Sequence, residues 1–226
     1  MKKLILPFLA WCTLPAICQE ANVRTEIVTI ALDQPVHGLF FDNGEEIAWF
    51  QALPTGLGEP LKYNGPRRLM LRSSEAEFSQ PPPLPPAHAW VDLPANSDRV
   101  LLACLKSGDA PVRMLAYDIG SARIRAGEYR FFNFSRSAVA IMIGQRRLEI
   151  KSGENNLVSD PSWRREVGEI DVAIGVMEND RIKPVYSSQW GNRPGRRNYI
   201  FIFDGPHDYN PIRIARFFDV PPADDE

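Results

Sequence analysis

The chain has 226 residues, and its 26 Lys and Arg side chains nearly balance its 28 Asp and Glu, for a formal net charge of −2. Such a charge lacks the basic footprint of nucleic-acid-binding proteins, so we expect no nucleic-acid partner. The chain is long enough to bury a core in one or two domains.

The first 18 residues are typical of a signal peptide that is removed on export. Two lysines precede an apolar run over residues 4–17, which is too short for a comfortable membrane span. Cleavage after Cys18 leaves Gln19 as the new terminus, and cleavage after Ala21 is an alternative. Lipid attachment at Cys18 is disfavoured by Ile17, because the residue before a lipidated cysteine is normally small. No later apolar run approaches about 18 residues, so we predict an exported protein, periplasmic or secreted, without a membrane span.

Only one of the three cysteines, Cys104, lies beyond this leader. The exported chain therefore has no internal disulfide, and its core must hold it together. Cys104 lies in the apolar run 100–105 and is expected to be a small buried hydrophobic residue.

Strand patterns follow one another along the rest of the chain, with apolar side chains at every second position. Asn43-Gly44 is a strong hairpin signal, because both residues tolerate the positive φ of a type I′ turn. Residues 52–66 are expected to be loop with at most one short edge strand. Nowhere do apolar residues recur at helical spacing for a dozen residues, so the sequence predicts an all-β protein. Its expected strands are 23–32, 36–41, 46–51, 67–72, 88–93, 100–105, 112–117, three short runs within 125–153, 156–158, 166–178, 182–188, 199–203 and 212–220.

The proline run over residues 81–86 cannot donate ladder hydrogen bonds and should be extended. It is expected to be a stiff loop that crosses from one sheet to the other. The alternative is a docking ligand for an aromatic groove.

The sequence resembles itself at an offset of about 100 residues. Leu39 then falls on Val139, and the closing hairpins near Arg99 and Arg197 also match. A unit of this length suits a sandwich of seven or eight strands. We therefore predict two tandem antiparallel β-sandwich domains of immunoglobulin-like or cupredoxin-like size, at 20–120 and 121–221, before a disordered acidic tail at 222–226. The alternative is one large sandwich shared by both halves.

The two halves differ in charge. Residues 20–120 contain 13 acidic and 8 basic side chains, whereas residues 121–226 contain 15 acidic and 16 basic ones, of which 14 are arginine. Three of the acidic residues of the second half lie in the tail at 224–226, so its folded body has a net charge of about +4, which is too small for a nucleic-acid footprint.

Few residues are spaced for catalysis or metal binding. The histidines at 37, 88 and 207 are far apart, and neither a Gly-x-Ser-x-Gly motif nor a glycine-rich phosphate loop occurs. We therefore predict no metal and no cofactor. Asp204, His207 and Asp208 are the exception, since two carboxylates and an imidazole within five residues could serve as an acid/base pair or hold a hard cation.

Residues 187–197 offer a tryptophan and three arginines in a stretch rich in Gly and Pro. A Trp ring beside forked guanidinium donors suits a sugar ring, a carboxylate or a phosphate, so Trp190, Arg193, Arg196 and Arg197 are the predicted ligand-binding residues. The alternative for Trp190 is packing over the end of the sandwich. Trp49, Trp90 and Trp163 could extend the aromatic surface, but each is expected instead to pack in the core or at its rim.

The residues therefore favour a non-catalytic module of the envelope or secreted space. It would bind a glycan or an envelope protein through the end loops of its second half. Two alternatives remain: a secreted hydrolase that uses Asp204 with His207 or Asp208, and a structural spacer.

Overall fold

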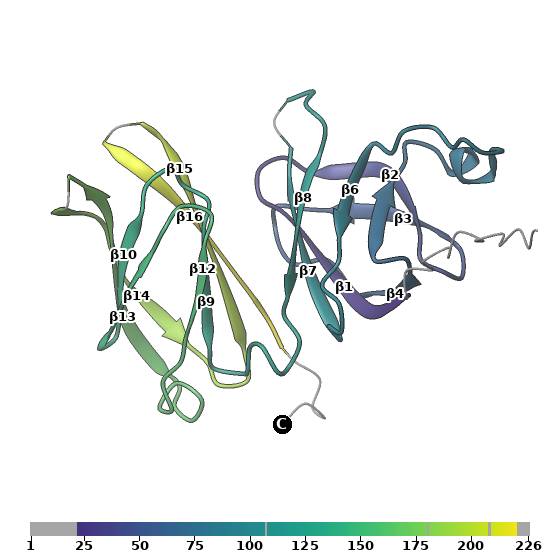
Figure 1. The fold of residues 1–226 in the computed structure, drawn as a ribbon. Helices are drawn as coiled ribbons and strands as arrows, with labels where there is room; N and C mark the ends of the chain where they lie inside the picture. The colour runs from purple at the N-terminus through teal and green to yellow at the C-terminus, as the bar shows by residue number, and fades with distance from the viewer. Residues whose placement is uncertain (1–21, 107, 180, 208, 221–226) are drawn as a thin grey trace, which may run out of the picture.

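The computed structural model describes residues 22–106, 108–179, 181–207 and 209–220 (Figure 1). The predicted signal peptide at 1–18, the lipid attachment at Cys18, the acidic tail at 222–226 and the role of Asp208 concern residues outside these ranges. They stay predictions.

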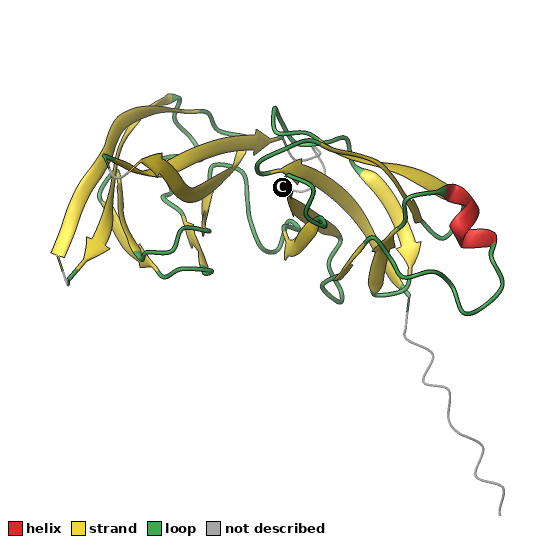
Figure 2. Cartoon of the chain, turned by 90° about the horizontal axis from the view of Figure 1, so that it is seen from above, coloured by secondary structure: helices red, strands yellow, loops and turns green. Residues whose placement is uncertain are grey.

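The protein is an all-β sandwich, as predicted. Strands contain 57% of the residues, and the helical element in the described ranges is one short 3-10 turn, η1 (Glu75–Ser79), red in Figure 2. None of the helical residues described forms a segment that is long and apolar enough to span a membrane.

The first half forms two layers. Its inner sheet has the order β4-β1-β7-β8, and its outer layer consists of the hairpin β2-β3 and the pair β5-β6, joined by a single bridge between Phe40 and Arg72. The eight strands are β1 (Val23–Ala31), β2 (Val36–Asp42), β3 (Ile47–Ala52), β4 (Leu61–Gly65), β5 (Arg68–Leu71), β6 (Ala89–Asp92), β7 (Arg99–Leu105) and β8 (Arg113–Asp118).

The second half repeats this topology, with β13 and β14 longer than the matching strands β5 and β6. Its inner sheet has the order β12-β9-β15-β16, and its outer sheet, β11-β10-β13-β14, is continuous. The strands are β9 (Tyr129–Asn133), β10 (Val139–Ile143), β11 (Arg146–Ile150), β12 (Asn155–Val158), β13 (Gly168–Glu178), β14 (Arg181–Asn192), β15 (Arg197–His207) and β16 (Asn210–Asp219).

The pairing also repeats in detail. Leu39 pairs with Phe50 in the first half, and Val139 pairs with Ile150 exactly 100 positions later. One pair in each half, β1-β7 and β9-β15, is parallel rather than antiparallel as expected. A parallel pair requires a long crossover, and the strands that intervene in each half provide it. The division into two domains near Ser121 stays a prediction.

Three apolar clusters hold these layers together. The first lies between the layers of the first half and includes Phe41 and Leu71, and the second lies between the layers of the second half and includes Phe131. The third joins the two inner sheets, where Ile30 and Phe201 are fully buried. The chain is thus a stack of four layers of strands (Figure 1).

A buried polar group accompanies this third cluster. Arg99 of β7 places its Nη2 3.2 Å from the Asp219 carboxylate of β16, and the Tyr199 hydroxyl donates to the same carboxylate at 3.2 Å. Burial raises the pKa of Asp219, and the two nearby arginines, Arg99 and Arg197, oppose that rise.

Two local predictions need correction. The proline run does not cross between sheets, because the strands on either side of it, β5 and β6, pair with each other. The hairpin at Asn43-Gly44 is confirmed, but the turn is not type I′, since only Gly44 has positive φ. The Asn43 side chain instead accepts hydrogen bonds from the backbone N–H groups of Glu45 and Glu46.

Candidate functional site

The predicted tryptophan site is part of the core. Trp190 lies in β14 rather than in a loop and is 4% exposed. Its ring stacks on Phe131 with the centroids 6.1 Å apart, its Nε1–H donates to the Tyr186 hydroxyl at 2.8 Å, and the Arg216 guanidinium lies 4.9 Å above it. The expectation of an open stacking face is therefore wrong at this residue, because the outer sheet continues through it to Asn192.

The three arginines predicted beside it do not form one surface. Arg197 is 1% exposed, and its Nη1 donates to the carbonyl of Ile119 between the two halves. Arg196 lies 3.8 Å over the ring of Phe218, and Arg193 is exposed. Arg197 has a structural role, while the binding roles of Arg193 and Arg196 stay predictions.

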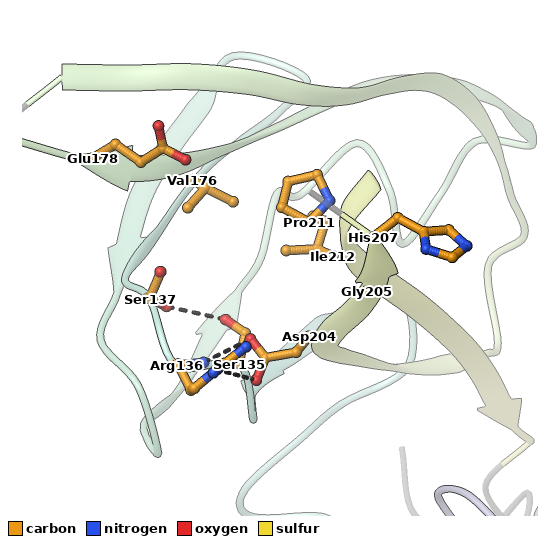
Figure 3. Close-up of a pocket in the computed structure, with 10 residues that line it drawn as sticks. All are labelled: Ser135, Arg136, Ser137, Val176, Glu178, Asp204, Gly205, His207, Pro211 and Ile212. Carbon is orange, nitrogen blue, oxygen red and sulfur yellow. Dashed lines mark hydrogen bonds and ion pairs between the residues drawn. The ribbon is translucent and has the colours of Figure 1, made fainter. Parts of the chain in front are cut away.

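Asp204 and His207 line one pocket of about 290 Å³ at the far end of the second half (Figure 3). Asp204 is engaged by Arg136, whose Nε lies 2.9 Å from Oδ2 and whose backbone N–H donates to Oδ1 at 3.1 Å. The His207 ring points away from Asp204 in Figure 3 and stacks on Tyr209. Within the described ranges, no group of three His, Cys, Asp or Glu side chains could hold a metal ion. The geometry gives the acid/base hypothesis no support.

The exposed aromatic side chains lie instead on the first half. Trp49 of β3 is 54% exposed and Trp90 of β6 is 55% exposed, whereas Trp163 is 8% exposed. The expectation that all three pack in the core or at its rim is therefore confirmed for Trp163 and wrong for Trp49 and Trp90.

Strand alternation places both tryptophans on the same face. Phe50 beside Trp49 and Val91 beside Trp90 are buried in the first cluster, so each tryptophan points outward from the outer layer. Phe40 pairs with Trp49 and Met70 pairs with Trp90 on this side. We call this set, Phe40, Trp49, Met70 and Trp90, the tryptophan face. The sequence alone does not decide this, because apolar residues flank each tryptophan and compete with it for the core-facing positions.

A cleft of about 530 Å³ lies beside Trp49, and Gln51, Thr55 and Glu59 are among its lining residues. No ring or guanidinium group among the described residues stacks on Trp49, which is 54% exposed, so part of its indole is available for contact. The cleft thus combines an apolar ring with an amide, a hydroxyl and a carboxylate.

The loop that borders this cleft is tied to β1 through Thr29. The Gly58 N–H donates to the Thr29 carbonyl at 2.8 Å, and the Thr29 hydroxyl donates to the Gln51 carbonyl at 2.7 Å. A Cβ at Gly58 would lie 2.4 Å from the Thr29 Oγ1, so this close approach requires glycine.

Trp90 has a different environment. The Arg68 guanidinium lies 4.4 Å over its ring and is oriented by an ion pair with Asp92 at 2.9 Å. The hydrogen bond from Arg68 lowers the pKa of Asp92. One face of Trp90 is thus covered by a cation, and the ring remains half-exposed next to Met70.

A pinned loop borders the tryptophan face. Arg72, the outward residue next to Phe40, is 2% exposed because the segment with η1 and the proline run covers it. Its Nη1 donates to the Pro85 carbonyl at 2.5 Å, it lies 3.8 Å from the Glu77 carboxylate, and its guanidinium is 5.4 Å from the Phe78 ring. The segment with η1 and the proline run is therefore held in place beside the tryptophan face.

No protein-family model matches this chain, and the search of curated proteins found no similar sequence. Its function must therefore be inferred from the chemistry and geometry of its own residues.

Proposed function

We propose that this protein is a non-catalytic glycan-binding module that holds sugar rings against the tryptophan face. The observation that carries the proposal is the pair of half-exposed indoles, Trp49 and Trp90, on one side of a single layer. Exposed apolar surface of this kind marks interaction sites in proteins.

The chemistry next to Trp49 favours a sugar over a purely apolar ligand. A pyranose ring has an apolar C–H face that stacks on an indole, and its hydroxyl groups need donors and acceptors around the rim. Gln51, Thr55 and Glu59 supply both kinds of group around the cleft. An apolar partner would leave these polar groups without hydrogen bonds when it excluded water.

The rigidity of the site also supports binding. Thr29 and Gly58 hold the loop beside the cleft in place, and Arg72 holds the segment with η1 and the proline run. A preformed surface avoids the entropic cost of ordering loops when a ligand binds. Because β2, β3, β5 and β6 are adjacent, Trp49 and Trp90 are separated by about three strand spacings, about 14 Å, so they would contact different rings of one oligosaccharide.

Binding of the full chain to a glycan array and to insoluble polysaccharides tests the proposal, with variants Trp49→Ala and Trp90→Ala. Each substitution should weaken binding about tenfold, equivalent to about 1.4 kcal/mol, with the larger loss at Trp49, because no guanidinium group covers its ring as Arg68 covers that of Trp90. The thermal midpoint should change little. Trp49→Phe should restore part of the affinity, since a smaller ring still stacks.

A second pair of variants tests the site first predicted from the sequence. Arg193→Gln and Arg196→Gln should leave glycan binding unchanged, because neither residue is near the tryptophan face. Binding that survives both alanine substitutions but is lost with these arginines would move the site to the second half. A chain that binds no glycan at all contradicts the proposed function.

A further inference from the structure

A second groove, of about 710 Å³, lies at one end of the first half. It forms where β1 begins, where β4 ends and where the chain passes from β6 to β7. Its polar lining consists of two arginines and three asparagines, namely Asn22, Arg24, Asn64, Arg67 and Asn96. None of these residues lines the cleft beside Trp49.

The two arginines are held in the same way. Arg67 donates from Nε to the Leu93 carbonyl at 3.1 Å, and Arg24 donates from Nε to the Asn64 side-chain carbonyl at 3.4 Å. Each guanidinium is thus oriented by its Nε edge. Its two terminal amino groups, with four N–H donors, remain available to a ligand.

Neither Arg24 nor Arg67 forms an ion pair within the described part of the chain, and no carboxylate lines the groove. Acidic residues outnumber basic ones by 13 to 8 in the first half. Arg68, Arg72 and Arg99 of this half pair with carboxylates, whereas Arg113, which lies in β8 away from the groove, forms no ion pair within the described residues. The groove therefore gathers positive charge in an otherwise acidic unit.

The asparagines add neutral donors. Asn64 orients Arg24 through its carbonyl oxygen, which leaves its amide NH₂ group as a donor. Asn96 has a φ of 60°, a left-handed conformation that asparagine tolerates better than most residues, and it lies in the tight connection before β7. A set of forked cations and amide donors without an acid matches an anion that carries several acceptor oxygens.

We propose that this groove is an oxyanion site, which binds a carboxylate or a sulfate ester of a ligand through Arg24 and Arg67. A carboxylate accepts two parallel N–H bonds from one guanidinium, and a sulfate offers oxygens to both. The site is independent of the tryptophan face, so either assignment can fail without the other.

Nuclear magnetic resonance titrations of the ¹⁵N-labelled full chain test the site with two probes, sodium acetate and sodium sulfate. Ionic strength is kept constant with sodium chloride, so that general screening does not change. Saturable shifts are expected at the side-chain amides of Asn64 and Asn96 and at the Nε–H groups of Arg24 and Arg67. Saturation by acetate alone identifies a carboxylate site, and saturation by sulfate alone identifies a sulfate site.

The variants Arg24→Gln and Arg67→Gln should each weaken binding at least tenfold. Both side chains are exposed and should not be needed for folding. The matched control is Arg113→Gln in β8, which removes an exposed positive charge of the same half away from the groove. Shifts that do not saturate with either probe, that chloride reproduces, or that survive in both groove variants overturn the proposal.

Discussion

The two halves share one topology but differ in where their tryptophans lie. Those of the second half are in the core, and those of the first half are on the outer surface. In the second half Trp163 and Trp190 are buried, and Trp190 stacks within the core. In the first half Trp49 and Trp90 point outward and are more than half exposed. Folding alone explains the first arrangement, since burial of a large ring stabilises a core. It does not explain the second, which indicates that these positions serve an interaction.

The outer layers differ for a related reason. In the second half β13 and β14 pair over their whole length and give a continuous sheet. In the first half β5 and β6 have four residues each, and only the bridge between Phe40 and Arg72 joins them to the neighbouring hairpin. The short strands leave room for the loop that Arg72 pins against the outer face. The outer layer of the second half is therefore one regular sheet, whereas that of the first half is interrupted and carries a loop on its outer face.

The largest expected effect comes from replacing a buried tryptophan with alanine, compared with the same substitution at an exposed tryptophan. Trp190→Ala should lower the free energy of unfolding by about 3–5 kcal/mol, because it leaves a cavity beside Phe131 and an unpaired Tyr186 hydroxyl. Trp49→Ala should cost less than about 1 kcal/mol. Urea denaturation measures both. Equal losses would show that Trp49 is a packing residue and would remove the contrast between the halves.

The sequence was sufficient to predict the strands and the all-β class, because alternating burial leaves a direct trace. Ile170, Val172 and Ile174 are buried, as their alternation predicts. The sequence also indicated where a hairpin would form at Asn43-Gly44. It did not indicate the turn type, because the Asn43 side chain replaces the backbone geometry that the dipeptide normally adopts.

The candidate site was harder to predict, because a period of two does not say which set of positions faces the core. Trp49 and Phe50 are both aromatic, and only the pairing of β3 with β2 decides that Phe50 is inside. Trp190 was misplaced for the opposite reason. Gly191 and Pro194 suggested a loop, but β14 continues through Gly191 to Asn192 because β13 offers partners along its whole length.

A smaller effect is expected from the contact between the halves. Asp219→Asn should cost about 3 kcal/mol, because Arg99 would be left buried without its carboxylate. The matched control is Asp204→Asn, which breaks the ion pair with Arg136 on the surface. That change should cost less than about 1 kcal/mol, since exposed pairs contribute little. If the two variants were equally stable, the polar group between the inner sheets would have no structural role.

A still smaller loss of stability is expected when the segment that Arg72 holds beside the tryptophan face is released. Arg72→Met keeps the aliphatic stem and removes the charge, so the Pro85 carbonyl and Glu77 lose their partner. A loss of about 1–3 kcal/mol is expected, together with faster amide hydrogen exchange at η1. Arg68→Met on the adjacent surface should not change exchange at η1. Unchanged exchange in Arg72→Met would show that the loop is held by other contacts.

The smallest difference is expected between the unfolding transitions of the two halves, which should coincide. Burial raises the pKa of Cys104 to about 12, so at pH 8.5 its thiol is protonated when folded, whereas an unfolded cysteine is about half thiolate. The stability linked to this group is therefore full below pH 8.5 and is lost as the pH rises towards 12. Alkylation of Cys104 at pH 8.5 consequently reports the unfolding of the first half.

Fluorescence can report the second half in the same sample. With Trp11, Trp49 and Trp90 replaced by phenylalanine, and with Cys12 and Cys18 replaced by serine, Trp163 and Trp190 report one half and Cys104 reports the other. The third apolar cluster joins the inner sheets through fully buried residues such as Ile30 and Phe201, so neither half can lose its fold without exposing the other's core-facing surface. The two urea transitions should coincide within error. A transition at Cys104 that precedes the loss of tryptophan fluorescence would show that the first half unfolds alone, and that its surface is held by a separable domain.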